Sequence, residues 1–106
     1  MPPDPAIVPV RGEVTFSNVT EFDRRLERTF GEGARNLVID LSEVTFIDSS
    51  GLSALLTASS RARERGGAVA LVLAQGEPPS IFRFRGVDRL LSLHVSREDA
   101  VHSLSR

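Results

Sequence analysis

The sequence contains no cysteine, and its charged residues nearly cancel. The absence of cysteine excludes disulfides, thiolate metal sites and thiol nucleophiles, and it suits a reducing compartment. The formal net charge of -1 provides no overall field that would attract nucleic acid or an anionic membrane. We therefore expect no direct nucleic-acid binding and no membrane binding.

Long apolar runs are also missing from the chain. No segment approaches the roughly 20 apolar residues that a membrane helix requires, and the first residues lack the basic and apolar regions of a signal peptide. The 106 residues fit one domain, and a hydrophobic content of 41% allows a modest core. These features predict a soluble cytoplasmic protein.

Motifs for metal binding and catalysis are scarce. The two histidines, His94 and His102, fall on different predicted elements, and no H-E-x-x-H spacing occurs. Residues 51–55 (Gly-Leu-Ser-Ala-Leu) begin like a nucleophile elbow but lack its closing glycine. No Walker or dinucleotide-binding glycine motif follows a predicted strand. We expect no metal, no cofactor and no catalytic residue, and therefore a protein that is not an enzyme.

Apolar segments of strand length alternate with segments of helical periodicity along the chain. Strands are predicted around residues 7–10, 36–41, 68–74 and 90–95, and helices at 19–30, 49–65, 80–85 and 96–104. The alternation predicts an α/β fold with a mainly parallel sheet, right-handed crossovers and about four helices. Residues 1–5, with three of the six prolines, are expected to be a flexible arm before a domain at 6–106.

Some local signals are specific. Pro9 lacks an N–H group, so the first strand is expected at or near a sheet edge, and residues 11–13 (Arg-Gly-Glu) are expected to leave it. Asn18 and Glu21 have the spacing of a capping box at the start of the first helix. Ser96, with an acidic residue three positions later, is a predicted cap for the last helix.

The segment Asp48-Ser49-Ser50-Gly51 lies where a predicted strand ends and a helix begins. Free backbone N–H groups and the positive end of the helix dipole converge at such a point, so an anion or phosphate would be stabilised there. Aspartate and serine are also common helix caps, and glycine permits a tight turn. The residues by themselves therefore fit a purely structural cap as well as a functional site.

Residues 38–56 closely resemble the STAS domain family, specifically the bacterial anti-sigma factor antagonists. They hold an apolar strand, the turn Phe-Ile-Asp-Ser-Ser-Gly-Leu at 46–52 and a leucine-rich helix in unbroken order. The resemblance extends more weakly over nearly the whole chain, and it implies a compact right-handed β-α superhelix. It also implies a protein that binds an anti-sigma factor serine kinase, frees a sigma factor and so regulates transcription.

The resemblance further implies a switch at the turn. The kinase would phosphorylate Ser49, which breaks the complex, and a serine phosphatase would restore binding. Asp48, Ser50 and Gly51 would position the turn and cap the helix. The surface that the resemblance implies for the partner comprises Glu13, Thr15, Asp48, Ser49, Leu52 and Ser53.

Two features depart from the family pattern. Many antagonists have Gly-Glu-Leu-Asp where this chain has Gly-Glu-Val-Thr at residues 12–15, and the N-terminus is shorter than usual. Thr15 removes one charge from the expected partner surface, so we expect an altered choice of partner. The short N-terminus is expected to remove or shorten the first strand.

An alternative within the same family is a STAS subunit of a lipid or anion transport complex, which has no phosphorylation switch.

Overall fold

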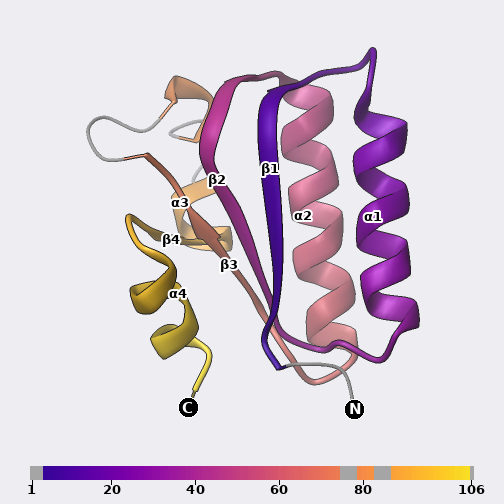
Figure 1. Cartoon of the computed structure of the whole chain (residues 1–106), viewed down its shortest axis with the longest axis vertical. Helices are drawn as coiled ribbons and strands as arrows, with labels where there is room; N and C mark the ends of the chain where they lie inside the picture. The colour runs from indigo at the N-terminus through magenta and orange to yellow at the C-terminus, as the bar shows by residue number, and fades with distance from the viewer. Residues whose placement is uncertain (1–3, 75–78, 83–86, 106) are drawn as a thin grey trace.

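The computed structural model describes residues 4–74, 79–82 and 87–105 (Figure 1). Their strands pair in the order β1-β2-β3-β4, and every pair is parallel. The predicted α/β fold with a parallel sheet and about four helices is therefore confirmed. The elements are, in chain order, β1 (Ala6–Val14), α1 (Val19–Gly31), β2 (Leu37–Ile47), α2 (Ser49–Glu64), β3 (Val69–Val72), α3 (Val87–Leu90), β4 (Ser92–His94) and α4 (Arg97–Ser103).

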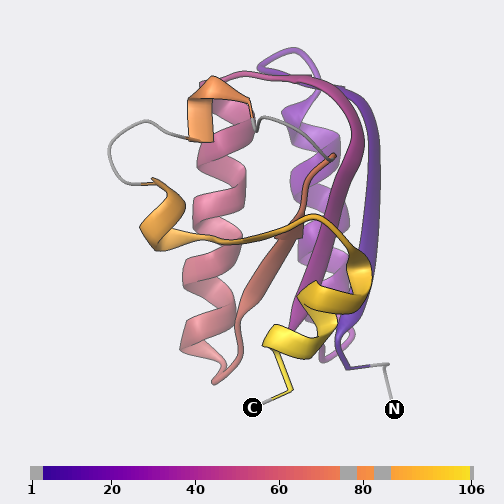
Figure 2. The same ribbon diagram turned by 90° about the vertical axis from the view of Figure 1, so that its left-hand side faces the viewer.

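The sheet separates two layers of helices. Helices α1 and α2 cover one face, and α4 lies on the other (Figures 1 and 2). Side chains alternate along β2, as they must in a strand: Leu37 and Ile39 belong to the main core under α1 and α2, whereas Val38 packs in a smaller cluster with Ala100 of α4. Both faces of β2 are buried over residues 37–41, which explains the near-continuous apolar sequence there, whereas residues 42–46 are exposed or half-buried.

Strand β1 lies at the sheet edge, as Pro9 predicts, but it is longer than expected. The prediction that residues 11–13 leave the strand is wrong, because Arg11 pairs with Glu43 and Gly12 with Val44 of β2. The register shifts after Pro9 and again after Gly12, whose φ of 73° is in the left-handed region that favours glycine. Despite these local irregularities, the strand stays paired with β2 as far as Val14, which lies opposite Ile47.

The capping box predicted at α1 is wrong, although the helix begins where expected. The Asn18 side chain makes no cap hydrogen bond. Its Oδ1 instead accepts from the Thr15 N–H at 2.9 Å, and its Nδ2 donates to the Glu13 carbonyl oxygen at 2.9 Å. The amide therefore closes the loop between β1 and α1. The cap predicted for α4 is confirmed, because Ser96 Oγ accepts from the Asp99 N–H at 3.1 Å.

The C-terminal half differs most from the predictions. Helix α3 ends at Leu90, where a strand was expected, and β4 is confined to Ser92–His94. Of the helix predicted at 80–85, residues 80–82 form a short helical turn, while 83–85 lie outside the described residues. Phe82 of this turn is buried in the main core. Short elements carry too few residues for a clear period, so their type depends on tertiary packing.

Asp40 of β2 is a buried carboxylate that connects the sheet to α4. Its Oδ2 accepts from Arg97 Nε at 2.6 Å, and its Oδ1 accepts from the Ser42 N–H at 2.9 Å. Burial by itself raises the pKa of Asp40, but the hydrogen bonds from Ser42 and from Arg97 outweigh it and hold the pKa below its usual value. The pair therefore stabilises the docking of α4 while Asp40 is ionised.

We expect Arg97→Ala to lower the free energy of unfolding by about 1–2 kcal/mol at pH 7, because a buried carboxylate loses a charge-assisted hydrogen bond. The pKa of Asp40 is lower in the folded than in the unfolded state, so this stabilisation is present above the unfolded pKa and is lost as the pH falls through the folded pKa. Urea titrations should therefore show a difference in the free energy of unfolding between the wild type and Arg97→Ala at neutral pH, and this difference should shrink below about pH 4. Arg89→Ala, at an exposed position of α3, is the control. A loss of stability in Arg97→Ala that did not depend on pH would contradict the stabilising role of the Asp40–Arg97 ion pair.

Candidate functional site

Asp48 connects the end of β2 to the start of α2. It is the N-cap residue of α2, and its Oδ1 accepts from the N–H groups of Ser50 at 2.8 Å and Gly51 at 3.1 Å. Ser50 thus contributes its backbone N–H group to the cap. Two of the helix N–H groups that could bind an anion are therefore already occupied by a carboxylate of the chain itself.

The same carboxylate also holds the loop between β1 and α1. Asp48 Oδ2 accepts from the Phe16 N–H at 3.0 Å, and the Asp48 N–H donates to the Val14 carbonyl oxygen at 3.2 Å. The pKa of Asp48 lies below its usual value, chiefly because of the Phe16 N–H and then because of those of Gly51 and Ser50. Asp48 is consequently ionised at neutral pH and joins two segments that are distant in the sequence.

Gly51 is buried where α2 begins against the two strands. A Cβ atom at this position would lie 2.6 Å from Ile47 Cγ1 and 2.9 Å from the Val14 carbonyl oxygen. Both distances are shorter than real Cβ contacts, so the close approach of α2 to β1 and β2 requires glycine here.

Ser49 is the first residue of α2, and it is exposed. Ser53 is also exposed and lies one helical turn further along, so the two side chains project from the same side of α2. Leu52, in contrast, is half-buried and packs against the main core. An enzyme that approaches this end of α2 can reach Ser49 without unfolding the helix.

The remaining residues of the predicted partner surface lie in or beside the β1–α1 loop. Glu13 is exposed, and Thr15 is half-buried with its carbonyl oxygen bonded to the N–H groups of Asn18 and Val19. The Asp48 side chain accepts a hydrogen bond from the Phe16 N–H, so the loop that contains Thr15 and Phe16 lies beside the turn that contains Ser49. The predicted surface is thus assembled from two segments that meet at Asp48.

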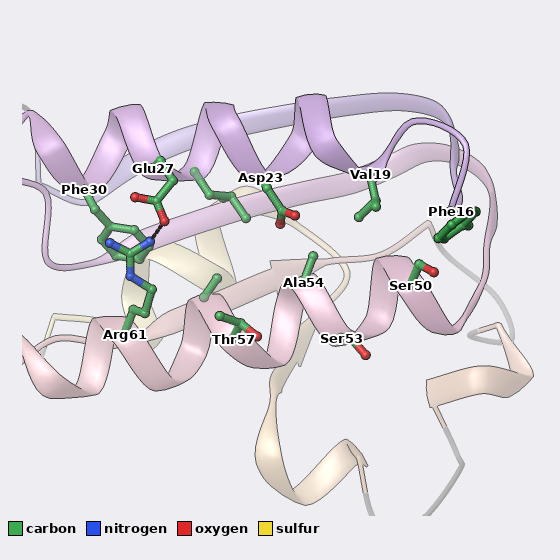
Figure 3. A pocket seen from close by; sticks show the side chains of 12 residues that line it. Phe16, Val19, Asp23, Glu27, Phe30, Ser50, Ser53, Ala54, Thr57 and Arg61 are labelled. Atoms are coloured by element: carbon green, nitrogen blue, oxygen red, sulfur yellow. Dashed lines mark hydrogen bonds and ion pairs between the residues drawn. The ribbon is translucent and has the colours of Figure 1, made fainter.

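A groove that the sequence did not predict runs between α1 and α2 from this end of the molecule (Figure 3). Its volume is about 550 Å³. Apolar side chains of α1 and small side chains of α2 line it, together with a few polar groups. The lining residues are Phe16, Val19, Asp23, Leu26, Glu27, Phe30, Ser50, Ser53, Ala54, Thr57, Ala58 and Arg61.

The two ends of the groove differ in character. At one end Arg61 forms an ion pair with Glu27 and lies over the Phe30 ring, 5.0 Å from its centroid. At the other end Phe16 lies near Ser50 and is 80% exposed (Figure 3). The signal that could have pointed to this end was an aromatic residue in a polar loop, but the groove itself depends on the spacing of two helices and has no sequence signature.

Among residues 4–74, 79–82 and 87–105, no group of three or more His, Asp or Glu side chains is placed to hold a metal ion. Within the same residues, no helix combines the length and apolar character needed to cross a membrane. Ser92 and His94 form a hydrogen bond of 2.6 Å on β4, which β2 and β3 separate from β1 in the sheet.

The fold and the site define a small parallel α/β domain whose central strand runs into a capped Asp-Ser-Ser-Gly turn at the start of a helix. The model of the STAS domain family matches residues 2–100. The chain therefore belongs to the STAS domain family, which confirms the resemblance seen in the sequence.

Solved structures of similar fold include anti-sigma factor antagonists and parts of transport proteins. A candidate anti-sigma factor antagonist from Thermotoga maritima is 20% identical with a TM-score of 0.82, covering 94% of this chain and 88% of that one. SpoIIAA of Bacillus, an anti-sigma factor antagonist, is 16% identical. The structure of its unphosphorylated form matches with a TM-score of 0.74, covering 92% of this chain and 84% of SpoIIAA. The murine anion transporter Slc26a9 is 24% identical with a TM-score of 0.76, covering 92% of this chain but 17% of the transporter. At these identities the likeness shows the fold.

Proposed function

We propose that this chain is an anti-sigma factor antagonist that binds an anti-sigma factor serine kinase and is released when Ser49 is phosphorylated. The observation that carries the proposal is the exposed position of Ser49 directly after the ionised cap Asp48. Membership of the STAS family and the similarity in fold to SpoIIAA, which has been solved in phosphorylated and unphosphorylated forms, support it.

The proposed reaction is a phosphoryl transfer for which this chain supplies the acceptor. Ser49 Oγ attacks the γ-phosphorus of the kinase-bound ATP, the bond from that phosphorus to the bridging oxygen of ADP breaks, and the hydroxyl proton passes to a base of the kinase. A serine phosphatase then hydrolyses the ester, which returns the hydroxyl group and inorganic phosphate. This chain needs no catalytic residue for either step.

The charges around Ser49 explain why a phosphate would oppose binding. Phosphoserine adds about two negative charges at neutral pH. The adjacent Asp48 carboxylate is ionised and already accepts from the N–H groups of Ser50 and Gly51. The phosphate would therefore lie beside a negative charge and would not find these two N–H groups free. The ADP left on the kinase would add further repulsion, since its phosphates lie beside the group just transferred.

The test begins by capturing a partner with Ser49→Ala as bait and identifying it by mass spectrometry. The purified partner is then incubated with ATP and the wild-type protein. We expect one phosphoryl group on Ser49, none on Ser49→Ala, and one still on Ser49 in Ser50→Ala, which removes the neighbouring hydroxyl group and serves as the control for the site. A partner that modifies no serine of this chain, or that still modifies Ser49→Ala, would refute the proposal.

A second candidate function is a STAS subunit of a lipid or anion transport complex. The similarity in fold to a part of the murine anion transporter favours it. In that case the captured partner would be a transport protein or its ATPase, and incubation with ATP would leave Ser49 unmodified. The same capture experiment therefore separates the two candidates.

A further inference from the structure

We propose that the groove between α1 and α2 receives an amphipathic helix of the kinase partner, with Phe16 as the apolar anchor of the contact. This inference rests on the proposed function. It adds a docking surface beyond the turn, with a stated chemistry for its occupant: an apolar face for the groove and a basic side chain for Asp23.

Phe16 has the features of an interface anchor. It is 80% exposed, so its ring gains much from burial against a partner. Its backbone is already fixed, because its N–H donates to Asp48 Oδ2, and the Asn18 amide closes the same loop. A partner therefore need not order this loop when it binds, which lowers the entropic cost of the contact.

The lining of the groove specifies the chemistry of the occupant. Leu26, Ala54 and Ala58 are buried and form an apolar floor. Of the two acidic side chains that α1 contributes, Glu27 is paired with Arg61, whereas none of the ion pairs among the described residues involves Asp23. Asp23 is exposed and lies between Glu27 and Val19 on the groove wall (Figure 3). An occupant with apolar side chains and one cation complements these groups.

The length and position of the groove fit a helix bound beside the switch. Its α2 wall extends from Ser50 to Arg61, which is about 16 Å at 1.5 Å per residue and matches about three turns of a partner helix. A volume of about 550 Å³ accommodates the side chains of one helical face. The groove begins at Ser50, next to Ser49, so a partner seated there is in position to present its nucleotide to the Ser49 hydroxyl.

The test measures the dissociation constant of the purified, identified kinase for each variant by calorimetry. Phe16→Ala is expected to weaken binding at least tenfold while retaining the backbone hydrogen bond to Asp48. Asp23→Arg is expected to weaken binding about tenfold, with an effect that shrinks at high salt. Val95→Ala removes another exposed apolar side chain, and Glu32→Arg reverses another exposed charge; both controls should stay within twofold of the wild type.

The outcomes distinguish this inference from the proposed function. If Ser49→Asp loses affinity but Phe16→Ala and Asp23→Arg bind like the wild type, the groove is not the docking surface and the phosphorylation switch stands. If the captured partner is not a kinase, both proposals fail. Losses confined to Phe16→Ala and Asp23→Arg, with intact Val95→Ala and Glu32→Arg, support the groove.

Discussion

Gly51→Val is expected to lower the free energy of unfolding by about 3 kcal/mol, which corresponds to a fall in Tm of about 10 °C or more for a domain of this size. A Cβ atom at Gly51 would collide with the Ile47 side chain and with a carbonyl oxygen of β1, at 2.6 and 2.9 Å. The Ile47 side chain would have to repack within the core, and the contact with the backbone oxygen of Val14 cannot relax without moving α2 away from β1. A displaced α2 would also weaken the hydrogen bonds of the Asp48 cap.

Gly51→Ala and Gly31→Ala form a matched pair for this prediction. Alanine favours a helix over glycine by up to about 1 kcal/mol, so both changes gain propensity. Gly31 ends α1, and a Cβ atom there meets nothing within 4 Å, so Gly31→Ala should be neutral or slightly stabilising. Gly51→Ala should lower the stability of the protein despite the gain in helix propensity. Chemical denaturation measures both, and equal effects at the two positions would contradict the close approach of α2 to the strands.

Ser49→Asp is expected to weaken binding of the kinase about a hundredfold, equivalent to about 3 kcal/mol. The change places a second carboxylate beside Asp48, at the surface that we propose packs against the partner. It should not unfold the protein, because a negative charge in the first turn of a helix is favourable and α2 has no acidic residue there. Loss of binding would therefore reflect the interface rather than the fold.

Ser49→Asn is the control for Ser49→Asp, because asparagine has nearly the same size as aspartate and no charge. Its affinity for the kinase is expected to stay much closer to that of the wild type. Calorimetric titrations at two salt concentrations would separate charge from shape, since screening reduces the penalty of Ser49→Asp. If both substitutions weaken binding equally, bulk at Ser49 rather than charge opposes the complex.

The main elements of the fold could be predicted because each carries a strong period or a clear boundary. The apolar run of β2 and the periodicity of α1 are long enough to specify their type. The start of α2 at Ser49 follows from the cap preference of the residues before it. Helix α3 and strand β4 span four and three residues, too short for such a signal.

The site was only partly accessible from the sequence. The turn at Asp48 could be recognised because its residues are contiguous. The bond from Asp48 to Phe16 could not, because it joins positions 32 residues apart and depends on how β1 ends beside β2. The prediction of a capping box at Asn18 was wrong for a related reason, since its side-chain amide bonds to two backbone groups of the preceding loop and strand instead of to the helix.

The phosphorylation switch is tested by comparing the phosphorylated and unphosphorylated forms of the same protein. The chain is phosphorylated with its purified kinase and ATP, the two forms are separated by ion exchange, and the site is mapped by mass spectrometry before each form is titrated with the kinase. We predict one phosphate on Ser49, at least a hundredfold weaker binding of the phosphorylated form, and full recovery of binding after phosphatase treatment. Equal affinities of the two forms for the kinase, or a phosphate only at a residue other than Ser49, would refute a switch at Ser49.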